Sequence, residues 1–442
     1  MALIRSLTSG TSSLKAHQQR LDVISNNIAN VNTVGYKSSE ASFADQFSQV
    51  LGLGVAPTAI QAGGVGGVDP VQIGLGVRLG SVKTDFTQGS IRTTNRALDV
   101  ALTGDGFFSL KSNGQQYYSR AGSFSLDRNG NLVDSSTGSF VQGFNIKQDT
   151  TGRPMKDSAG SNILDRQLTS VEVSPNFKSN PRQTESVKIA GNLNASMQSG
   201  EAAQTSITVY DNIGNSHILQ MTFTKSTTAN QFAITATLDN NSLALPSGTN
   251  PITFNADGSM NTPLAFTVGG TALNAALGST STAFDATKSL DVTLASSNNL
   301  FNGLTQFAGQ NSVTAFEQDG YTAGNLARIS VDNTGRIVGA FTNGQSEILA
   351  QIAVAKFTNP GGLIKEGNNM YSVSPNSGLA NMGTAVEIFQ STQIKGGSLE
   401  DSNVDLTEQF TDLISTQRAF EAASRTITIS DQFLQEINQL KR

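Results

Sequence analysis

Apolar residues recur every seven positions near both ends of the chain, and this pattern predicts helices there. The end regions, 1–35 and 396–442, are expected to form one helical, coiled-coil-like domain. Each apolar line is too thin to hold a helix alone in water, so we expect these helices to pack on each other or on neighbouring copies. The residues of the two lines and their flanks are Leu7, Leu14, Leu21, Ile28 and Val31, then Leu406, Phe410, Leu413, Phe420, Ile427 and Leu434.

Amide side chains crowd into the end of the first predicted helix, at Asn26, Asn27 and Asn30. Asparagine is a poor helix former because its amide competes for backbone hydrogen bonds. Asn26 and Asn30 lie one helical turn apart, and we hypothesise that such amides fix the register between packed helices of different copies. Gly35 is expected to end the helix, and Tyr36 follows it.

Between the end regions, the pattern changes to short strands separated by glycine-containing turns. Residues 36–75 are predicted to be a linker or extended segment. Residues 76–146 and 300–395 share one style and are expected to form one β-domain, with 147–299 as a second β-domain inserted into it. The expected fold class is therefore mainly β with terminal α-helices, with nested β-domains of barrel or sandwich type.

The stretch TGDGFFSL, residues 103–110, is the most distinctive strand start. Gly104 and Gly106 allow the backbone to turn tightly, and Phe107 and Phe108 point to opposite faces of a strand. Two interpretations remain open: the phenylalanines of this strand start anchor the core on one side, or one of them faces an assembly partner.

Composition narrows the possible function classes. The 442 residues carry a net charge of −5 and no cysteine, which excludes disulfides, thiol catalysis and cysteine-ligated metal sites. The mild charge indicates no nucleic-acid partner. No stretch approaches the roughly 20 apolar residues of a membrane helix, so no membrane insertion is expected. The N-terminus lacks the apolar block of a cleaved signal peptide, so we expect a cytoplasmic protein or one that leaves the cell without such a signal.

Residues with catalytic or ligand-binding potential are scattered. His17 and His217 have no companions at metal-ligand spacing, and no nucleotide-binding or hydrolase motif occurs. The turn around Asp127, Asn129 and Asn131 lacks the closing glutamate of a calcium loop, so we interpret it as a hairpin. The sequence therefore predicts no catalytic, cofactor-binding or metal-binding residues, and no enzyme.

Motifs at both ends and in the middle resemble the bacterial flagellar axial proteins of the rod and hook. Their order along the chain makes the resemblance specific, and three further stretches resemble the hook members in particular. The shared motifs are SNNIANVNTVGYK (25–37), LDVALTGDGFF (98–108), YSRAGSFSLDRNGNLV (118–133) and the segment 397–442, and the hook-like stretches are 299–309, 319–345 and 349–363.

The resemblance implies a structural subunit that polymerises into a curved tube, transmits torque from rod to filament and is exported unfolded by the flagellar export apparatus to an extracellular hook. It also implies rod proteins, a hook cap and hook–filament junction proteins as partners. Ends that stay soluble until neighbours complete their core would suit such export. The alternatives are a distal rod subunit, against which the inserted block argues, a secreted β-rich adhesin or fibre protein, and a glycan-cleaving β-protein.

Overall fold

The computed structural model describes residues 2–57, 66–150, 154–157, 160–262, 264–278, 282–296, 299–388 and 392–440. The chain is mainly β with long helices at its ends, as the sequence predicts. It divides into two compact units. The first comprises Met1–Pro175, Ile329–Val338 and Ile348–Arg442, and the second comprises Asn176–Arg328 and Gly339–Glu347.

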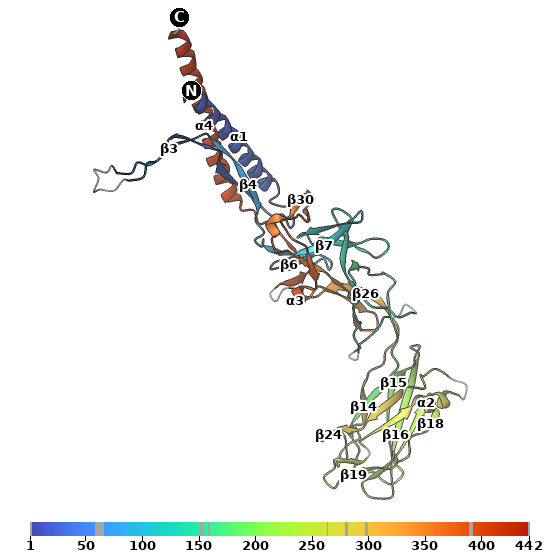
Figure 1. The fold of residues 1–442 in the computed structure, drawn as a ribbon. Helices are drawn as coiled ribbons and strands as arrows, with labels where there is room; N and C mark the ends of the chain where they lie inside the picture. Colours follow the sequence, from blue (N-terminus) through green and yellow to red (C-terminus); the bar gives the residue numbers. More distant parts are fainter. Residues whose placement is uncertain are drawn as a thin grey trace. The chain divides into compact units, whose positions relative to one another are not determined.

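The terminal helices α1 (Ala2–Ala29) and α4 (Leu406–Leu440) lie side by side and antiparallel (Figure 1). Asp405 caps α4, because its Oδ1 accepts the Thr407 backbone N–H at 2.8 Å. Polar pairs join the two helices: Ser6 Oγ with Ser430 Oγ at 3.1 Å, Arg20 Nη2 with Asp412 Oδ2 at 2.9 Å, and Asn27 Nδ2 with Gln409 Oε1 at 2.9 Å.

The segment after α1, expected to be a linker or extended segment, contains paired strands. β1 (Ser39–Asp45) pairs antiparallel with β4 (Val77–Thr84), and both contact α1. Beyond them β2 (Ser48–Gly52) pairs with β3 (Val71–Gly74). Residues 58–65 of the predicted linker lie outside the described residues.

The first unit also contains most of a large antiparallel sheet, in the order β11-β7-β8-β31-β30, with short pairs beside it. Phe107 and Phe108 leave opposite faces of β7 and both are buried in the chain's own core, so the interpretation that one faces an assembly partner is wrong. The bounds are β5 (Ile91–Thr93), β6 (Val100–Thr103), β7 (Phe107–Ser112), β8 (Gln115–Ser119), β9 (Phe124–Leu126), β10 (Leu132–Asp134), β11 (Phe140–Asn145), β12 (Thr169–Ser170), β29 (Val354–Lys356), β30 (Ile364–Gly367), β31 (Met370–Ser372), β32 (Asn381–Gly383), β33 (Gln393–Gly396), β34 (Ser398–Glu400), α3 (Ala385–Ile388) and the 3₁₀ turn Pro360–Gly362.

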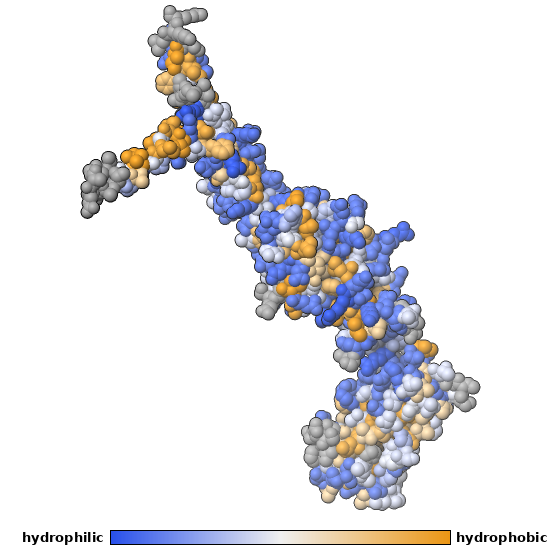
Figure 2. Space-filling view, in the orientation of Figure 1, coloured by the Kyte–Doolittle hydropathy of each residue, from blue (hydrophilic) through white to orange (hydrophobic). Residues whose placement is uncertain are grey.

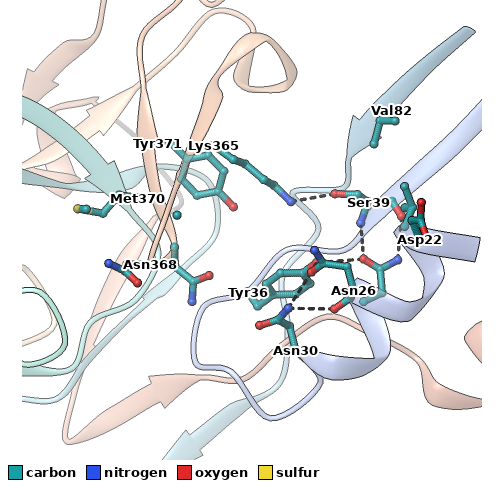
Figure 3. A pocket seen from close by; sticks show the side chains of 14 residues that line it. Asp22, Asn26, Asn30, Tyr36, Ser39, Val82, Lys365, Asn368, Met370 and Tyr371 are labelled. Atoms are coloured by element: carbon teal, nitrogen blue, oxygen red, sulfur yellow. Dashed lines mark hydrogen bonds between the residues drawn. The ribbon is translucent and has the colours of Figure 1, made fainter. Parts of the chain in front are cut away.

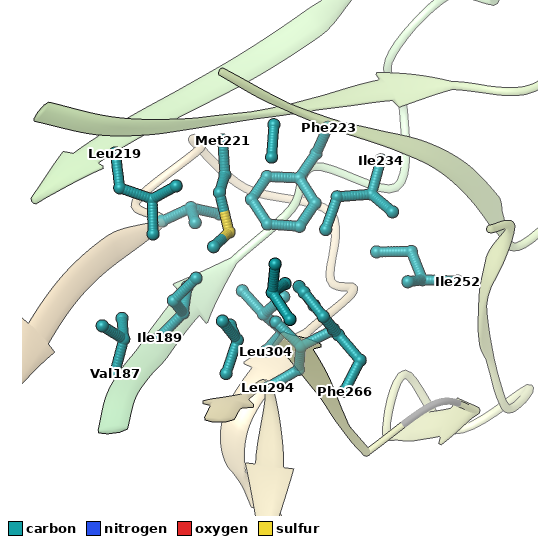
Figure 4. Packing of buried hydrophobic residues seen from close by; sticks show 14 of the residues in the cluster. Val187, Ile189, Leu219, Met221, Phe223, Ile234, Ile252, Phe266, Leu294 and Leu304 are labelled. Carbon is teal, nitrogen blue, oxygen red and sulfur yellow. The ribbon is translucent and has the colours of Figure 1, made fainter. Parts of the chain in front are cut away.

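The described part of the second unit holds two six-stranded sheets, one centred on β14 and one on β16. Apolar side chains of both sheets point at one another and form a sandwich core (Figure 4). Alternation along β16 and β17 produces this core, because every second residue is buried. The bounds are β13 (Lys178–Ser179), β14 (Ser186–Asn192), β15 (Ala202–Tyr210), β16 (Ser216–Lys225), β17 (Gln231–Leu238), β18 (Asn241–Leu243), β19 (Ile252–Phe254), β20 (Met260–Thr262), β21 (Ala265–Gly269), α2 (Gly270–Leu277), β22 (Ser289–Thr293), β23 (Ala295–Ser296), β24 (Asn299–Thr305) and β25 (Thr314–Gln318).

The borders of the compact units fall later in the chain than the expected domain borders at 147 and 299. Residues 169–170 pair with β11 and so belong to the first unit. Strands β24 and β25 pair with β14 and so belong to the second. Residues of β26 (Gly324–Val331), β27 (Arg336–Phe341) and β28 (Ser346–Ile352) are divided between the units.

The turn around Asp127 is a hairpin, as predicted. Asp127 connects β9 and β10, and its Oδ1 accepts the backbone N–H groups of Asn129 and Asn131 at 2.9 and 2.7 Å. The side-chain amide of Asn131 donates to Oδ2 at 3.0 Å, and this bond holds the pKa of Asp127 below its ordinary value. Both oxygens of the Asp127 carboxylate therefore accept hydrogen bonds from residues of the same turn.

Candidate assembly site

The helix pair approaches closely through small side chains. A Cβ added to Gly10 of α1 would lie 2.9 Å from Ile427 Cγ1 of α4. Among the α4 residues whose burial the structure describes, the buried positions are Thr416, Ala423 and Ser430, again seven residues apart. The buried residues of α4 thus recur every seven positions, but they are small or polar rather than large and apolar. Of the predicted apolar line, Ile427 contacts α1 at Gly10.

Most of the predicted apolar positions lie at the margin of this seam. Leu7, Leu14, Leu21, Ile28 and Val31 of the first segment are half-buried, as are Leu413, Phe420, Ile427 and Leu434 of α4. Leu406 and Phe410 are exposed. Large apolar side chains continue along the exposed surface of α4, where the exposed fractions are Leu406 40%, Phe410 50%, Ile414 57%, Ile429 51%, Phe433 52% and Ile437 49%.

A second apolar surface lies on the strands β2 and β3 of the first unit. Figure 2 shows hydrophobic residues gathered on these strands and along the C-terminal part of α4. The exposed apolar residues of the strands and their flanks are Phe47, Val50, Leu51, Leu53, Val55, Val68, Val71 and Ile73. Apolar surface of this extent is typical of proteins that associate.

The asparagines at the end of α1 form hydrogen bonds within the chain. Asn30 Nδ2 donates to the Asn26 carbonyl and to Asn26 Oδ1 at 2.9 and 2.8 Å, and the Tyr36 hydroxyl donates to the Oδ1 atoms of Asn26 and Asn27 (Figure 3). Asn27 is buried, and its Nδ2 donates to the Ser39 carbonyl at 2.8 Å. These amides therefore fasten the end of α1 to the segment that follows it. The hypothesis that the amides also form contacts between copies stays a prediction.

Gly35 has a different role from the predicted one. Helix α1 ends at Ala29, six residues earlier, and the backbone continues in turns, with Val31 N–H donating to the Ile28 carbonyl at 3.3 Å and Thr33 N–H to the Asn30 carbonyl at 3.1 Å. Gly35 adopts a φ of +68°, and a Cβ there would lie 2.6 Å from the Ala121 backbone nitrogen. Only glycine lets the segment after α1 approach the β-strands this closely. Gly104 and Gly106 also have positive φ, as their predicted turn requires.

A buried ionic junction lies directly beyond Gly35. Lys37 and Glu400 are fully buried, and Lys37 Nζ donates to Glu400 Oε1 at 2.7 Å and to the Thr87 carbonyl at 2.6 Å. Glu400 Oε1 also accepts the Gly89 backbone N–H at 2.9 Å. Arg120 is buried too, with Nε 3.8 Å from Glu400 Oε2. Oppositely charged groups therefore converge from the N-terminal segment, the first β-region and the C-terminal segment.

Burial and charge act in opposite directions on this junction. Burial lowers the pKa of Lys37, and the nearby Glu400 carboxylate partly offsets this effect. Burial likewise lowers the pKa of Arg120 and raises the pKa of Tyr371, which lies beside it. A buried cation next to another cation is costly unless an anion compensates it, so Glu400 is the group on which the junction depends.

Further side-chain hydrogen bonds fasten the same region. Asn403 Oδ1 accepts the Ser38 backbone N–H at 2.8 Å, and its Nδ2 donates to the Asp85 carbonyl at 3.0 Å. Lys365 Nζ donates to Ser39 Oγ at 2.8 Å, and Asn369 Nδ2 to the Val34 carbonyl at 2.8 Å. These last contacts border a cleft of about 500 Å³ between the end of α1 and the β30–β31 hairpin (Figure 3).

Sequence reasoning did not single out Lys37, Arg120, Glu400 or Asn403. The signal was available, since each lies inside one of the motifs that carry the family resemblance. The partners lie hundreds of positions apart, and charge spacing along the chain does not indicate such contacts.

The described residues offer no metal site and no membrane helix. In the part of the chain that the structure describes, no group of three or more histidine, cysteine, aspartate and glutamate residues is arranged to hold a metal ion. None of the described helices has the length and apolar character that crossing a membrane requires.

Family models match consecutive parts of the chain. They are described as flagella basal body rod protein (residues 7–37), flagellar hook protein FlgE/F/G D1 domain (101–177), flagellar basal body protein FlaE D2 domain (176–321) and flagellar basal body rod FlgEFG protein C-terminal (395–440).

Relatives match over the whole length. The flagellar hook protein FlgE of Treponema pallidum is 36% identical, with 100% of both chains covered. That of Borreliella burgdorferi is 34% identical over 99% of this chain and 100% of its own, and that of Escherichia coli is 34% identical over 97% and 98%. A solved structure, Helicobacter pylori flagellar hook protein FlgE2, is 15% identical and covers 70% of this chain and 100% of its own with a TM-score of 0.46.

Proposed function

Because the chain belongs to the flagellar hook protein family, we propose that its copies polymerise into the hook as a tube whose inner wall is formed by the paired helices α1 and α4. The hook subunit is a structural component of the flagellum, and its polymer adjoins the rod. The β-domains form the outer layers of the tube in this proposal, with the division of the chain into helical, first β- and inserted β-domains that the sequence predicts.

The observation that carries the proposal is the exposed apolar surface of α4. Residues such as Phe410, Ile414 and Phe433 are about half exposed on a helix whose small-residue side already packs on α1. Burying apolar surface contributes about 25 cal/mol per Å², so repeated contacts of this surface with other copies favour association. The half-buried residues of the predicted seams belong to the same interface in this proposal.

The finer parts of the function extend the same proposal. The subunit leaves the cell through the flagellar export apparatus without a cleaved signal, and the hook cap and hook–filament junction proteins contact the polymer ends. Thin apolar lines diluted by serine, threonine and asparagine support export of ends that order only among neighbours. We propose no catalytic, cofactor-binding or metal-binding role for the chain.

The test is the double variant Phe410→Ser with Ile414→Ser. Both side chains are exposed, so the circular dichroism spectrum of the single chain stays unchanged, while polymers visible by electron microscopy are lost. Phe316→Ser, at a 59% exposed phenylalanine of β25 in the second unit, is the matched control and retains tube formation. Tubes of normal yield from the double variant would contradict the proposal.

A distal rod subunit is the second candidate, and it shares the end helices. The inserted second unit favours the hook, because the family models and the full-length relatives include this region. An adhesin or a glycan-cleaving enzyme needs no paired helices with exposed apolar surface, so the double variant would leave its binding or cleavage intact.

A further inference from the structure

The chain contains four Asn–Gly pairs, which begin at Asn113, Asn129, Asn302 and Asn343. Asparagine is among the thermally labile residues of proteins, and a following glycine has no side chain to shield its backbone nitrogen. By local sequence the four pairs are equivalent. The structure separates them, because the surroundings fix three of the pairs and leave one open.

The open pair is the two-residue turn Asn113–Gly114 between β7 and β8. Both residues are exposed, and both have positive φ, of 50° and 83°, as the favoured two-residue hairpin turn requires. Within the described residues, neither the Asn113 side chain nor the Gly114 N–H forms a hydrogen bond. A Cβ on Gly114 would have no atom within 4 Å, so the turn projects into open space.

Asn129 is exposed too, so exposure alone does not distinguish the pairs. The Gly130 N–H, however, donates to the Asp127 carbonyl at 3.1 Å. Gly130 is also buried, and a Cβ there would lie 2.6 Å from the Val173 carbonyl oxygen. A reaction of the Gly130 nitrogen therefore requires this turn to open first.

The pair at Asn343 is held through both of its residues. The Gly344 N–H donates to the Phe341 carbonyl at 3.0 Å. Asn343 Nδ2 donates to the Thr322 carbonyl at 2.8 Å, and its Oδ1 accepts the Gln345 N–H at 3.1 Å. The side chain and the neighbouring nitrogen are thus fixed by separate hydrogen bonds.

Asn302 lies inside a strand rather than a turn. It belongs to β24, which pairs with β14 and with β23. A Cβ on Gly303 would lie 2.2 Å from the Leu294 carbonyl oxygen, so the backbone has no room to rearrange locally. Rearrangement at this pair requires the strand to separate from its neighbours.

We propose that Asn113 is a site of spontaneous covalent modification, at which the folded chain loses a side-chain amide. The Gly114 nitrogen gives its proton to the solvent and attacks the Asn113 side-chain carbonyl carbon, which forms a succinimide ring and releases the amide nitrogen as ammonia. Water then opens the ring at either of its carbonyls and gives aspartate or isoaspartate. Both products add a negative charge to the hairpin tip, and isoaspartate also lengthens the backbone of the turn.

The experiment is incubation of the folded full-length chain in mildly alkaline buffer, with peptide mass spectrometry at intervals to measure aspartate and isoaspartate at each pair. Asn113 converts about tenfold or more faster than the other three asparagines, because only they wait for local opening. A parallel sample in denaturant removes that protection and brings the four rates within about threefold of one another. All four pairs lie outside the terminal helices, so the result does not depend on polymerisation.

The variant Asn113→Gln is the control, because it keeps an amide but moves it one carbon farther from the Gly114 nitrogen. It abolishes conversion at the hairpin tip and leaves the rates at Asn129, Asn302 and Asn343 unchanged. The proposal is overturned if any of these three converts as fast as Asn113 in the folded chain, or if Asn113 converts only in denaturant.

Discussion

The contact between Gly10 and Ile427 offers a sharp test of the helix pair. A Cβ on residue 10 would lie 2.9 Å from Ile427 Cγ1 and 3.3 Å from Thr426 Oγ1. Gly10→Ala gains about 1 kcal/mol of helix propensity. It also costs about 1–3 kcal/mol of overpacking, since Ile427 has to move. The alanine variant is therefore expected to be close to neutral or mildly destabilising.

Gly10→Leu adds three further carbon atoms at the same point, against the side chains of Ile427 and Thr426. We expect a loss of about 3 kcal/mol in the pairing of α1 with α4, at the upper end of overpacking costs. That loss corresponds to roughly a hundredfold fall in the ratio of paired to separated helices. Thr11→Leu introduces the same side chain one residue later at an exposed position, so it leaves the pairing intact.

The assay is polymer yield by sedimentation and electron microscopy, with swimming in soft agar of a strain that carries only the variant gene. We expect wild-type behaviour for Thr11→Leu, a small reduction at most for Gly10→Ala, and no tubes or swimming for Gly10→Leu. If Gly10→Leu polymerises at the same critical concentration as the unmodified chain, close packing of α1 on α4 is not part of the assembled state.

Other substitutions probe separate parts of the account. Phe223→Ala removes a fully buried side chain from the second unit and should lower the free energy of unfolding by about 3–5 kcal/mol. Circular dichroism should show a lower thermal midpoint, and an unchanged midpoint would argue against the sandwich core. Gly35→Ala places a Cβ within 2.6 Å of the Ala121 backbone nitrogen at a φ of +68°. The resulting strain of about 1–3 kcal/mol should speed hydrogen exchange of the backbone around residue 35, and unchanged exchange would refute the close approach. The pKa of Asp127 is lowered by its bond from Asn131, so its contribution to stability is present above the ordinary value of 3.8 and is lost as pH falls through the lower folded value. Asp127→Asn should therefore flatten the acid-unfolding profile below about pH 4, and an identical profile would contradict that assignment.

Local patterns predicted the elements well. The heptads indicated both terminal helices, and the turn at Asp127 was identified as a hairpin. These features depend on residues within a few positions of one another, where propensity and turn chemistry act directly.

Features that depend on distant contacts were not predictable in the same way. The apolar line suggested a leucine seam, but Gly10 and Ala423 let the helices approach through small side chains, and periodicity alone does not show which of two seven-residue lines faces the partner. The junction of Lys37 with Glu400 spans 363 positions and could be located only in the folded chain.

The central claim is that the exposed apolar side chains of α4 become buried among neighbouring copies. The most direct measurement is a cryo-electron microscopy structure of tubes assembled from this chain, at a resolution that shows side chains. The account predicts that Phe410, Ile414, Ile429, Phe433 and Ile437, each now about half exposed, lie buried against α1 or α4 of adjacent copies. Tubes in which these side chains still face water would contradict it.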